Sequence, residues 1–136
     1  VFPVANPDYL SKIDYDPDNI LSLRDHCLLE YERQDPTWIN WHVLFEALSQ
    51  EKVNVKPTRI YSNYGVLVDA VMNGAGITLG TNHLLGTLLQ SGKLVRLTQQ
   101  SYKSGRGYYL ARNDSKHLSR SAMRLRERLL SLAVFE

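Results

Sequence analysis

Short runs of apolar residues alternate along this chain with longer segments in which apolar residues recur every three or four positions. The first pattern is typical of buried strands and the second of helices that cover a sheet. Strands are predicted over residues 2–5, 27–31, 58–61, 77–79, 93–98 and 108–111. Helices are predicted over residues 7–13, 37–49, 64–73, 82–90 and 116–135, with a further short helix starting at Asp16-Pro17. This order indicates an α/β fold with a mostly parallel, helix-flanked sheet.

Capping residues mark most of the predicted helix starts. Asn6 and Asp16 each stand before a proline, which suits the first position of a helix. Ser62 and Asn63 precede a later helix as two possible capping side chains, and Asn82 is expected to cap the next one.

The helix predicted at 37–49 carries an apolar stripe that is rich in aromatic residues. Its members are Trp38, Trp41, Phe45 and Leu48. Helical spacing alone explains such a stripe, so we predict that these side chains pack into the core. The alternative is that these aromatic side chains line a ligand-binding site.

The last predicted helix has an apolar face and a basic face. Its apolar face, expected to be buried, holds Leu118, Ala122, Leu125, Leu129 and Leu132. Its basic stripe holds Lys116, Arg120, Arg124 and Arg128. Base-reading and aromatic residues are absent from the stripe, which favours a solvated face over a phosphate contact.

Composition excludes several classes of protein. The chain has 136 residues, of which 43% are hydrophobic and 22% charged, as in an ordinary globular domain. No apolar run is long enough to span a bilayer, so no membrane association is expected. A single cysteine excludes an internal disulfide and fits a reducing compartment. The chain opens on an apolar stretch without an initiator methionine, which indicates a piece of a longer protein.

The net charge of +2 is too small to imply a nucleic-acid partner by itself, and it hides an asymmetry. Residues 1–50 carry 3 basic and 9 acidic side chains, a net charge of −6. Residues 51–100 carry 5 and 2, and residues 101–136 carry 8 and 3, giving +3 and +5. Because apolar residues are interspersed among these charges, solvated faces of differing sign explain the gradient.

Residues suited to catalysis or metal binding do not form a convincing group. His26 and Cys27 are neighbours in sequence and should point to opposite faces, so Cys27 is predicted to be a small buried hydrophobe. Gly74-Ala75-Gly76 follows a helix and precedes a strand, the reverse of the order in dinucleotide-binding loops. No cofactor is expected.

Three acidic residues, Asp14, Asp16 and Asp18, are spaced like the start of a calcium loop. However, Pro17 falls inside the loop, and Asn19 stands where such loops need glycine. Helix capping by Asp16 explains these residues without a metal.

A ligand-binding site is a better hypothesis than a reactive one. Ligands of open α/β sheets bind at the carboxyl ends of strands, against the N-termini of the following helices. Asn6 follows the first predicted strand, and Ser62, Asn63 and Tyr64 follow the third. Helix N-termini favour anions, so a small carboxylate-bearing ligand is expected, with plain helix capping as the alternative.

The ordered motifs resemble the effector-binding domain of LysR-type transcriptional regulators. They are FPVANPDYL, PDNILSLRDHCLLEY, WINW, RIYSNYGVLVDAVMNGAGITLG, LLQSGKLVRL and GYYLAR. The most specific element is A-x-x-x-G-x-G-I-x-L, from Ala70 to Leu79. The W-x-x-W pair and the GYYL segment are most similar to the branch of glycine-cleavage activators and beta-lactamase regulators.

This resemblance implies a two-lobed, periplasmic-binding-protein-like (type 2) fold with a small effector between the lobes. Residues 4–105 would form the second lobe. Residues 1–3 and 106–136 would supply hinge strands, a returning strand and the C-terminal helix of an incomplete first lobe. The DNA-binding helix-turn-helix and the early part of the first lobe would lie outside this chain.

The resemblance also implies roles for individual residues. Ser62 and Asn63 match the polar pair that faces the effector, and Tyr108 matches an aromatic residue at the cleft. Asn6 would lie at the cleft edge. The chain departs from the family at Thr81-Asn82, where many relatives have proline, which leaves the local loop undefined.

The expected function is therefore effector sensing by a cytoplasmic regulator that is not an enzyme. This regulator is expected to form a homodimer or homotetramer. It would contact DNA only through the missing helix-turn-helix. The alternative is a lobe of a transporter's solute-binding protein, which would share the fold. A small enzyme on this fold is disfavoured because the sequence lacks a convincing acid/base pair.

Overall fold

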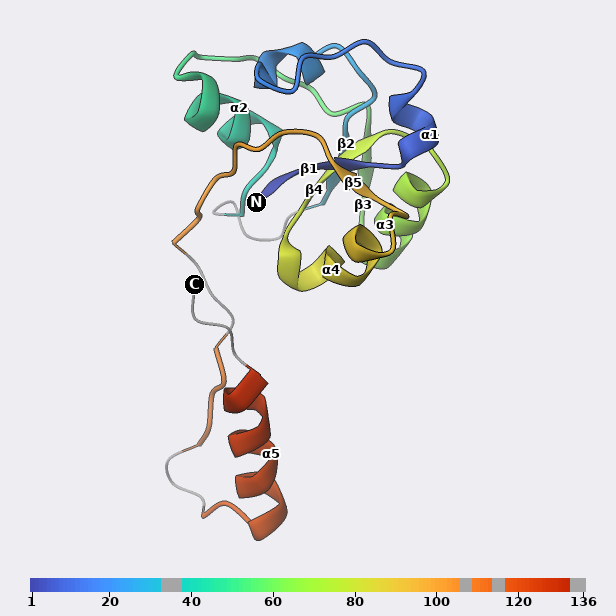
Figure 1. Ribbon diagram of the computed structural model, residues 1–136. Helices are drawn as coiled ribbons and strands as arrows, with labels where there is room; N and C mark the ends of the chain where they lie inside the picture. Colours follow the sequence, from blue (N-terminus) through green and yellow to red (C-terminus); the bar gives the residue numbers. More distant parts are fainter. Residues whose placement is uncertain (33–37, 106–108, 114–116, 133–136) are drawn as a thin grey trace. The chain divides into compact units, whose positions relative to one another are not determined.

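The computed structural model describes residues 1–32, 38–105, 109–113 and 117–132, and it divides the chain into two compact units, Val1–Ser104 and Gly105–Glu136 (Figure 1). The elements of the first unit are β1 (Phe2–Ala5), α1 (Pro7–Leu10), the 3-10 helix η1 (Ile20–Leu23), β2 (Leu29–Tyr31), α2 (Trp41–Ser49), β3 (Arg59–Tyr61), α3 (Tyr64–Met72), β4 (Ile77–Gly80), α4 (Asn82–Gln90) and β5 (Val95–Arg96). The second unit holds α5 (Arg120–Leu132).

The strands form two small sheets whose directions are mixed, so the prediction of a mostly parallel sheet is wrong in this respect. β1 lies between β4 and β5 and runs antiparallel to both. β2 and β3 pair in parallel, and a parallel bridge between Leu28 and Ile77 connects β2 to β4. The strand predicted at 93–98 is in fact the two-residue β5, which pairs antiparallel with β1. Hydrophobic patterning predicts burial of a strand, not the direction of its neighbour.

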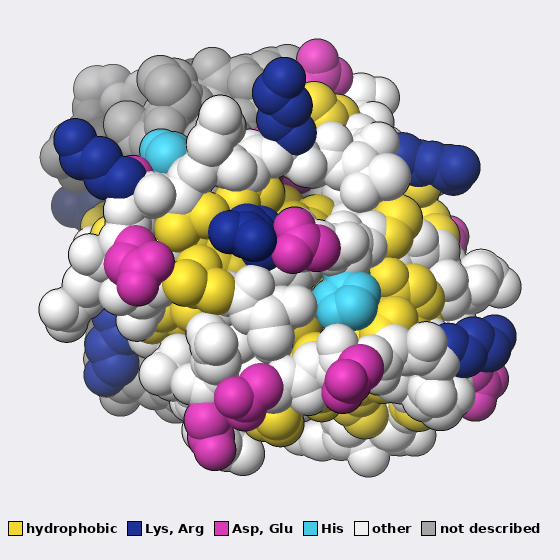
Figure 2. Space-filling view, turned by 90° about the horizontal axis from the view of Figure 1, so that it is seen from above, with side chains coloured by type: hydrophobic (Ala, Val, Ile, Leu, Met, Phe, Trp, Pro, Cys, Tyr) yellow, Lys and Arg dark blue, Asp and Glu magenta, His cyan; other side chains and the backbone are white. Residues whose placement is uncertain are grey.

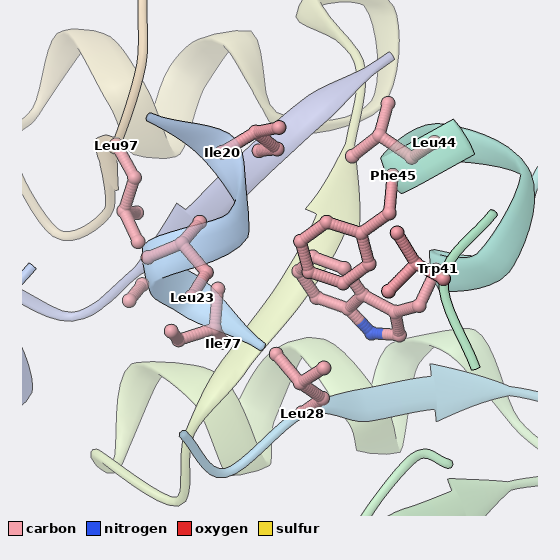
Figure 3. Packing of buried hydrophobic residues seen from close by; sticks show 10 residues of the cluster. Ile20, Leu23, Leu28, Trp41, Leu44, Phe45, Ile77 and Leu97 are labelled. Atoms are coloured by element: carbon pink, nitrogen blue, oxygen red, sulfur yellow. The ribbon is translucent and has the colours of Figure 1, made fainter. Parts of the chain in front are cut away.

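One hydrophobic core lies between α2, η1 and the strands (Figure 3). The Trp41 and Phe45 rings stack at its centre with centroids 5.6 Å apart, and both side chains are fully buried. The core prediction is confirmed for these two residues, and Leu48 is half-buried beside them. Trp38 is the exception, because α2 begins only at Trp41, and Trp38 is 52% exposed. The Asn40 side chain accepts a hydrogen bond from the Val43 amide at 2.7 Å and so sets this start.

A second core packs α3 and α4 against the strands. Its buried members are Phe2, Val4, Leu29, Leu67, Val68, Val71, Leu85 and Leu94. The turn that follows α3 reaches β4 through Gly76, whose φ is +155°. A Cβ at this position would lie 2.3 Å from the Cys27 carbonyl oxygen, so only glycine allows the two backbones to approach.

Two of the predicted capping residues cap a helix in the structure, and two do not. Asn6 caps α1 and Asn63 caps α3, as predicted. η1 is capped by Asn19 rather than Asp16, and α4 by Thr81 rather than Asn82. In both corrected cases two residues close to the helix start can cap, and the place where the chain leaves the extended conformation decides between them.

The second unit differs from the prediction in two ways. Residues 109–113 form no strand, and Tyr109 is exposed, so the strand predicted at 108–111 is wrong for its described part. Tyr108 lies outside the described residues. No α5 side chain is buried, and the predicted burial of Leu125, Leu129 and Leu132 is wrong. The apolar pattern identifies a helix face that requires cover, but it does not identify the segment that covers it.

None of the described helices combines the length and the apolar character that crossing a membrane requires.

Candidate functional site

The carboxyl ends of β2, β3 and β4 lie at one edge of the sheets. β2 and β3 are parallel, with Tyr31 opposite Tyr61. The parallel bridge between Leu28 and Ile77 shows that β4 runs in the same direction. β1 runs the other way and enters the first unit at this edge, since Phe2 pairs with Gly80. In α/β proteins this is the edge at which ligands bind.

Ser62, Asn63 and Tyr64 lie together at this edge, where β3 passes into α3. Asn63 is the N-cap, and its Oδ1 accepts a hydrogen bond from the Val66 amide at 3.1 Å. The side chains of Ser62 and Asn63 are exposed. Gly65 leaves room for the cap, because a Cβ there would lie 3.2 Å from Asn63 Oδ1. α3 therefore begins beside two exposed, neutral polar side chains, an arrangement that favours an anion.

Aromatic rings lie beside these polar groups. The Tyr64 ring meets the Tyr31 ring edge-on, with centroids 5.9 Å apart, and Tyr31 in turn contacts Trp38 at 6.1 Å. The Tyr64 hydroxyl donates to the Leu79 carbonyl at 3.4 Å. Helical spacing predicts Trp38 in the core, but its contact with Tyr31 places it at this edge. The signal that separates it from Trp41 is Asn40, a strong N-cap residue between them.

Asn6 does not lie with the other predicted site residues. It follows the carboxyl end of the antiparallel strand β1, where Ala5 pairs with Ile77, and so stands at the opposite edge of the sheet. Its Oδ1 accepts from the Asp8 amide at 2.7 Å, and its Nδ2 donates to the Met72 carbonyl at 2.7 Å. Met72 ends α3, whereas Asn63 caps its start. The Asn6 side chain thus joins the start of α1 to the end of α3.

The residues considered for catalysis and metal binding have structural contacts. Cys27 is half-buried, and its amide donates to the Tyr9 hydroxyl oxygen at 3.2 Å. Burial raises the pKa of Tyr9 above its ordinary value, partly offset by this hydrogen bond. Asp16 accepts from the Asp18 amide at 3.0 Å, as in a polar turn. Within the described ranges, no three His, Cys, Asp or Glu side chains come close enough to hold a metal ion.

A separate hollow lies away from this edge. It is lined by Arg24, Asp25, Asn54, Val55 and Lys56. Lys56 precedes β3 whereas Ser62 follows it, so this hollow is not part of the candidate site. On the face of the molecule shown in Figure 2, acidic and basic side chains are interspersed with hydrophobic ones, which fits a solvated surface.

Comparison with known proteins identifies the fold. The sequence matches the LysR substrate binding domain over residues 1–133. This match covers nearly all of the chain and decides the family. The chain belongs to the LysR substrate-binding domain family. It is an effector-binding domain of a LysR-type transcriptional regulator, in a family of regulators rather than enzymes. The match favours the regulator over the alternative, a lobe of a transporter's solute-binding protein.

Solved structures of LysR-type regulators share the fold. The effector domain of AmpR of Pseudomonas aeruginosa matches 96% of this chain with a TM-score of 0.64 at 16% identity. CrgA from Neisseria meningitidis matches 75% with a TM-score of 0.59 at 26% identity. The regulatory domain of AphB in Vibrio vulnificus matches 70% with a TM-score of 0.52 at 27% identity. The α/β, periplasmic-binding-protein-like fold is thereby confirmed.

This LysR-family chain is shorter than its structural neighbours. It spans 59% of the AmpR effector domain, 46% of the AphB regulatory domain and 34% of CrgA. Among curated proteins, none matches the sequence.

Proposed function

We propose that this LysR-type domain senses a small, anionic metabolite at the edge where β3 passes into α3. Ser62, Asn63 and Tyr64 would bind the effector, and Tyr108 would contribute an aromatic ring from the returning segment. The observation that carries the proposal is the exposed start of α3 beside Ser62 and Asn63. Backbone amides at a helix start bind carboxylates without needing a charged side chain.

Asn6, predicted at the cleft edge, receives a supporting role in this proposal. Both ends of its amide are used in hydrogen bonds to the backbone of α1 and α3. An effector at Asn6 would displace contacts that hold two helices in place.

We further propose that residues 4–105 form one lobe and that residues 1–3 and 106–136 belong to the hinge and to a second, incomplete lobe. The apolar side chains that α5 exposes support this division, because a lone helix of its length is only marginally stable in water. The greater length of the AmpR effector domain is consistent with it. The cleft between the lobes would then complete the effector site.

The proposed mechanism is a shift of a conformational equilibrium. An effector that contacts both lobes binds the closed arrangement better than the open one, and this difference in affinity drives closure. In the intact cytoplasmic regulator, a homodimer or homotetramer, closure would be transmitted to a helix-turn-helix outside this chain, which contacts DNA.

Variants of Asn63 test the anion site without removing the helix cap. Asn63→Ser and Asn63→Asp both keep a capping oxygen, but aspartate adds a negative charge where the anion would bind. With acetate as the probe, followed by amide chemical shifts of residues 62–65, Asn63→Asp should weaken binding about tenfold. Asn63→Ser should change it less than about threefold.

Asn19→Asp is the matched control, since it adds the same charge at the cap of η1. Acetate affinity should be unchanged in this variant. Equal affinity of the Asn63→Asp protein and the parent for acetate would exclude the start of α3 as the anion site.

A further inference from the structure

Three aromatic side chains contact one another in a row beside the proposed anion site. Tyr31 contacts Trp38 with ring centroids 6.1 Å apart and planes inclined by 47°. Tyr31 also meets Tyr64 edge-on at 5.9 Å with planes inclined by 86°. Tyr64 is the first residue of α3, so this row of ring contacts connects the helix start to Trp38. We call Tyr31, Trp38 and Tyr64 the aromatic shelf.

The inner part of the aromatic shelf is held in place by the core. Tyr31 and Tyr64 pack against the buried cluster that includes Phe2, Leu29 and Leu67. The end of β2 is fixed to β3, since the Glu32 amide donates to the Tyr61 carbonyl at 2.7 Å. A shelf positioned in this way loses little conformational freedom when a ligand stacks on it.

The outer part of the shelf is accessible. Trp38 is 52% exposed, whereas Trp41, three residues later, is fully buried. Single exposed aromatic residues are common on protein surfaces. Trp38 differs from such residues because its ring contacts Tyr31, whose ring in turn contacts Tyr64, the first residue of α3.

We propose that the aromatic shelf makes this domain selective for effectors in which a planar ring carries the carboxylate. The ring would stack on the exposed side of Trp38 while the carboxylate reaches the start of α3 beside Ser62. This inference rests on the proposed function and adds the chemical class of the ligand. Ring stacking strengthens binding by about three- to tenfold over an aliphatic group of the same size.

Three carboxylates of graded shape test the proposal on the 136-residue chain. Acetate carries only the anion, cyclohexanecarboxylate adds a puckered ring, and benzoate adds a planar ring. Chemical shifts of the amides at 62–65 and of the two indole N–H groups report on each titration. Benzoate should bind about three- to tenfold more tightly than cyclohexanecarboxylate and should shift the Trp38 indole signal. The Trp41 indole donates to the Leu29 carbonyl inside the core and should not move.

Variants of the shelf separate stacking from general apolar contact. Trp38→Leu should abolish the preference for benzoate over cyclohexanecarboxylate, while Trp38→Phe should keep part of it. Because Trp38 is largely exposed, both variants should fold. Tyr109→Leu removes another exposed aromatic ring and should leave the preference unchanged.

The outcomes distinguish the two proposals. If acetate shifts the amides at 62–65 but benzoate binds no better than cyclohexanecarboxylate, the aromatic shelf is overturned and the anion site stands. A benzoate preference that persists in Trp38→Leu also overturns the shelf. If benzoate shifts only the Trp38 indole and no carboxylate shifts the amides, the proposed anion site fails, and the inference that rests on it fails with it.

Discussion

At the scale of single residues, one backbone oxygen connects three elements of the first unit. The Leu29 carbonyl accepts a hydrogen bond from Trp41 Nε1 at 3.0 Å and another from the Thr78 hydroxyl at 3.1 Å. Leu29 belongs to β2, Trp41 to α2 and Thr78 to β4. All three residues are buried, where a polar group without a partner is costly.

This arrangement predicts that the two donors are energetically coupled. Thr78→Val should lower the free energy of unfolding by about 1 kcal/mol, and Trp41→Phe by about 2–3 kcal/mol, because it also leaves a cavity. In the double variant the Leu29 carbonyl loses both donors, so the loss should exceed the sum of the single losses by about 1 kcal/mol. Urea unfolding of the four proteins measures this coupling, and strictly additive losses would show that the shared carbonyl has no energetic role.

The same residues show what helical spacing can and cannot predict. Spacing correctly places Trp41 and Phe45 in the core, since both lie on the inner face of α2. Trp38 has the same spacing, but it precedes the Asn40 cap and lies at the candidate site. Periodicity identifies a face only within the limits of the helix, and those limits depend on which cap the folded chain uses.

At the scale of elements, the Tyr9 side chain connects the short helix α1 to the segment just before β2. The Tyr9 hydroxyl oxygen accepts from the Cys27 amide at 3.2 Å, and α1 has no buried side chain of its own. Burial raises the pKa of Tyr9, so the folded protein retains this proton at a pH where the unfolded chain releases it. The stabilisation from this proton is complete below the ordinary tyrosine pKa and decreases as the pH rises through the raised value.

A Tyr9→Phe variant should show this pH dependence by difference. At neutral pH it should be less stable than the parent by about 1 kcal/mol, because the Cys27 amide loses its acceptor. Above a pH of about 10 the gap should narrow, since only the parent loses the contribution of Tyr9. Urea midpoints of both proteins across the alkaline range test this. A gap that is constant with pH would contradict it, and the common loss from the other tyrosines cancels in the comparison.

Strand direction is the part of the element pattern that sequence analysis did not predict. The apolar runs correctly predict β1, β3 and β4, but β1 is antiparallel to both of its neighbours. This reversal has a consequence for the site. Asn6 follows β1 and Ser62 follows β3, so the sequence predicts both residues at the same edge of a parallel sheet. Because β1 is antiparallel, Asn6 lies at the opposite edge.

At the scale of the whole molecule, the family could be predicted from the sequence, because the ordered motifs extend over the chain and the LysR family match covers residues 1–133. The segment that covers the apolar face of α5 could not be predicted. Its apolar stripe is visible in the sequence, yet the described residues of the second unit bury none of its side chains. The division into lobes at residues 105 and 106 therefore remains a prediction.

The first unit closes on itself near its end. The Arg96 guanidinium lies over the Phe2 ring at 4.3 Å and donates to the carbonyls of Thr98, Gln99 and Gln100. The Tyr102 amide donates to the Val1 carbonyl at 2.9 Å. Both core clusters consist of residues that precede this closing segment or belong to it. Among the described residues, both core clusters of the first unit are thus complete by residue 104.

A chain ending at residue 104 should therefore fold with unchanged stability. Its urea midpoint, followed by the fluorescence of the buried Trp41, should equal that of the 136-residue chain, because no core residue is removed. The far-ultraviolet circular dichroism should decrease by the contribution of α5 alone. A chain ending at residue 94 is the control, since it lacks Arg96 and Leu97 and should unfold at a lower urea concentration. A midpoint for residues 1–104 as low as that of the control would show that the first unit requires residues 105–136, because its own core would then be insufficient for folding.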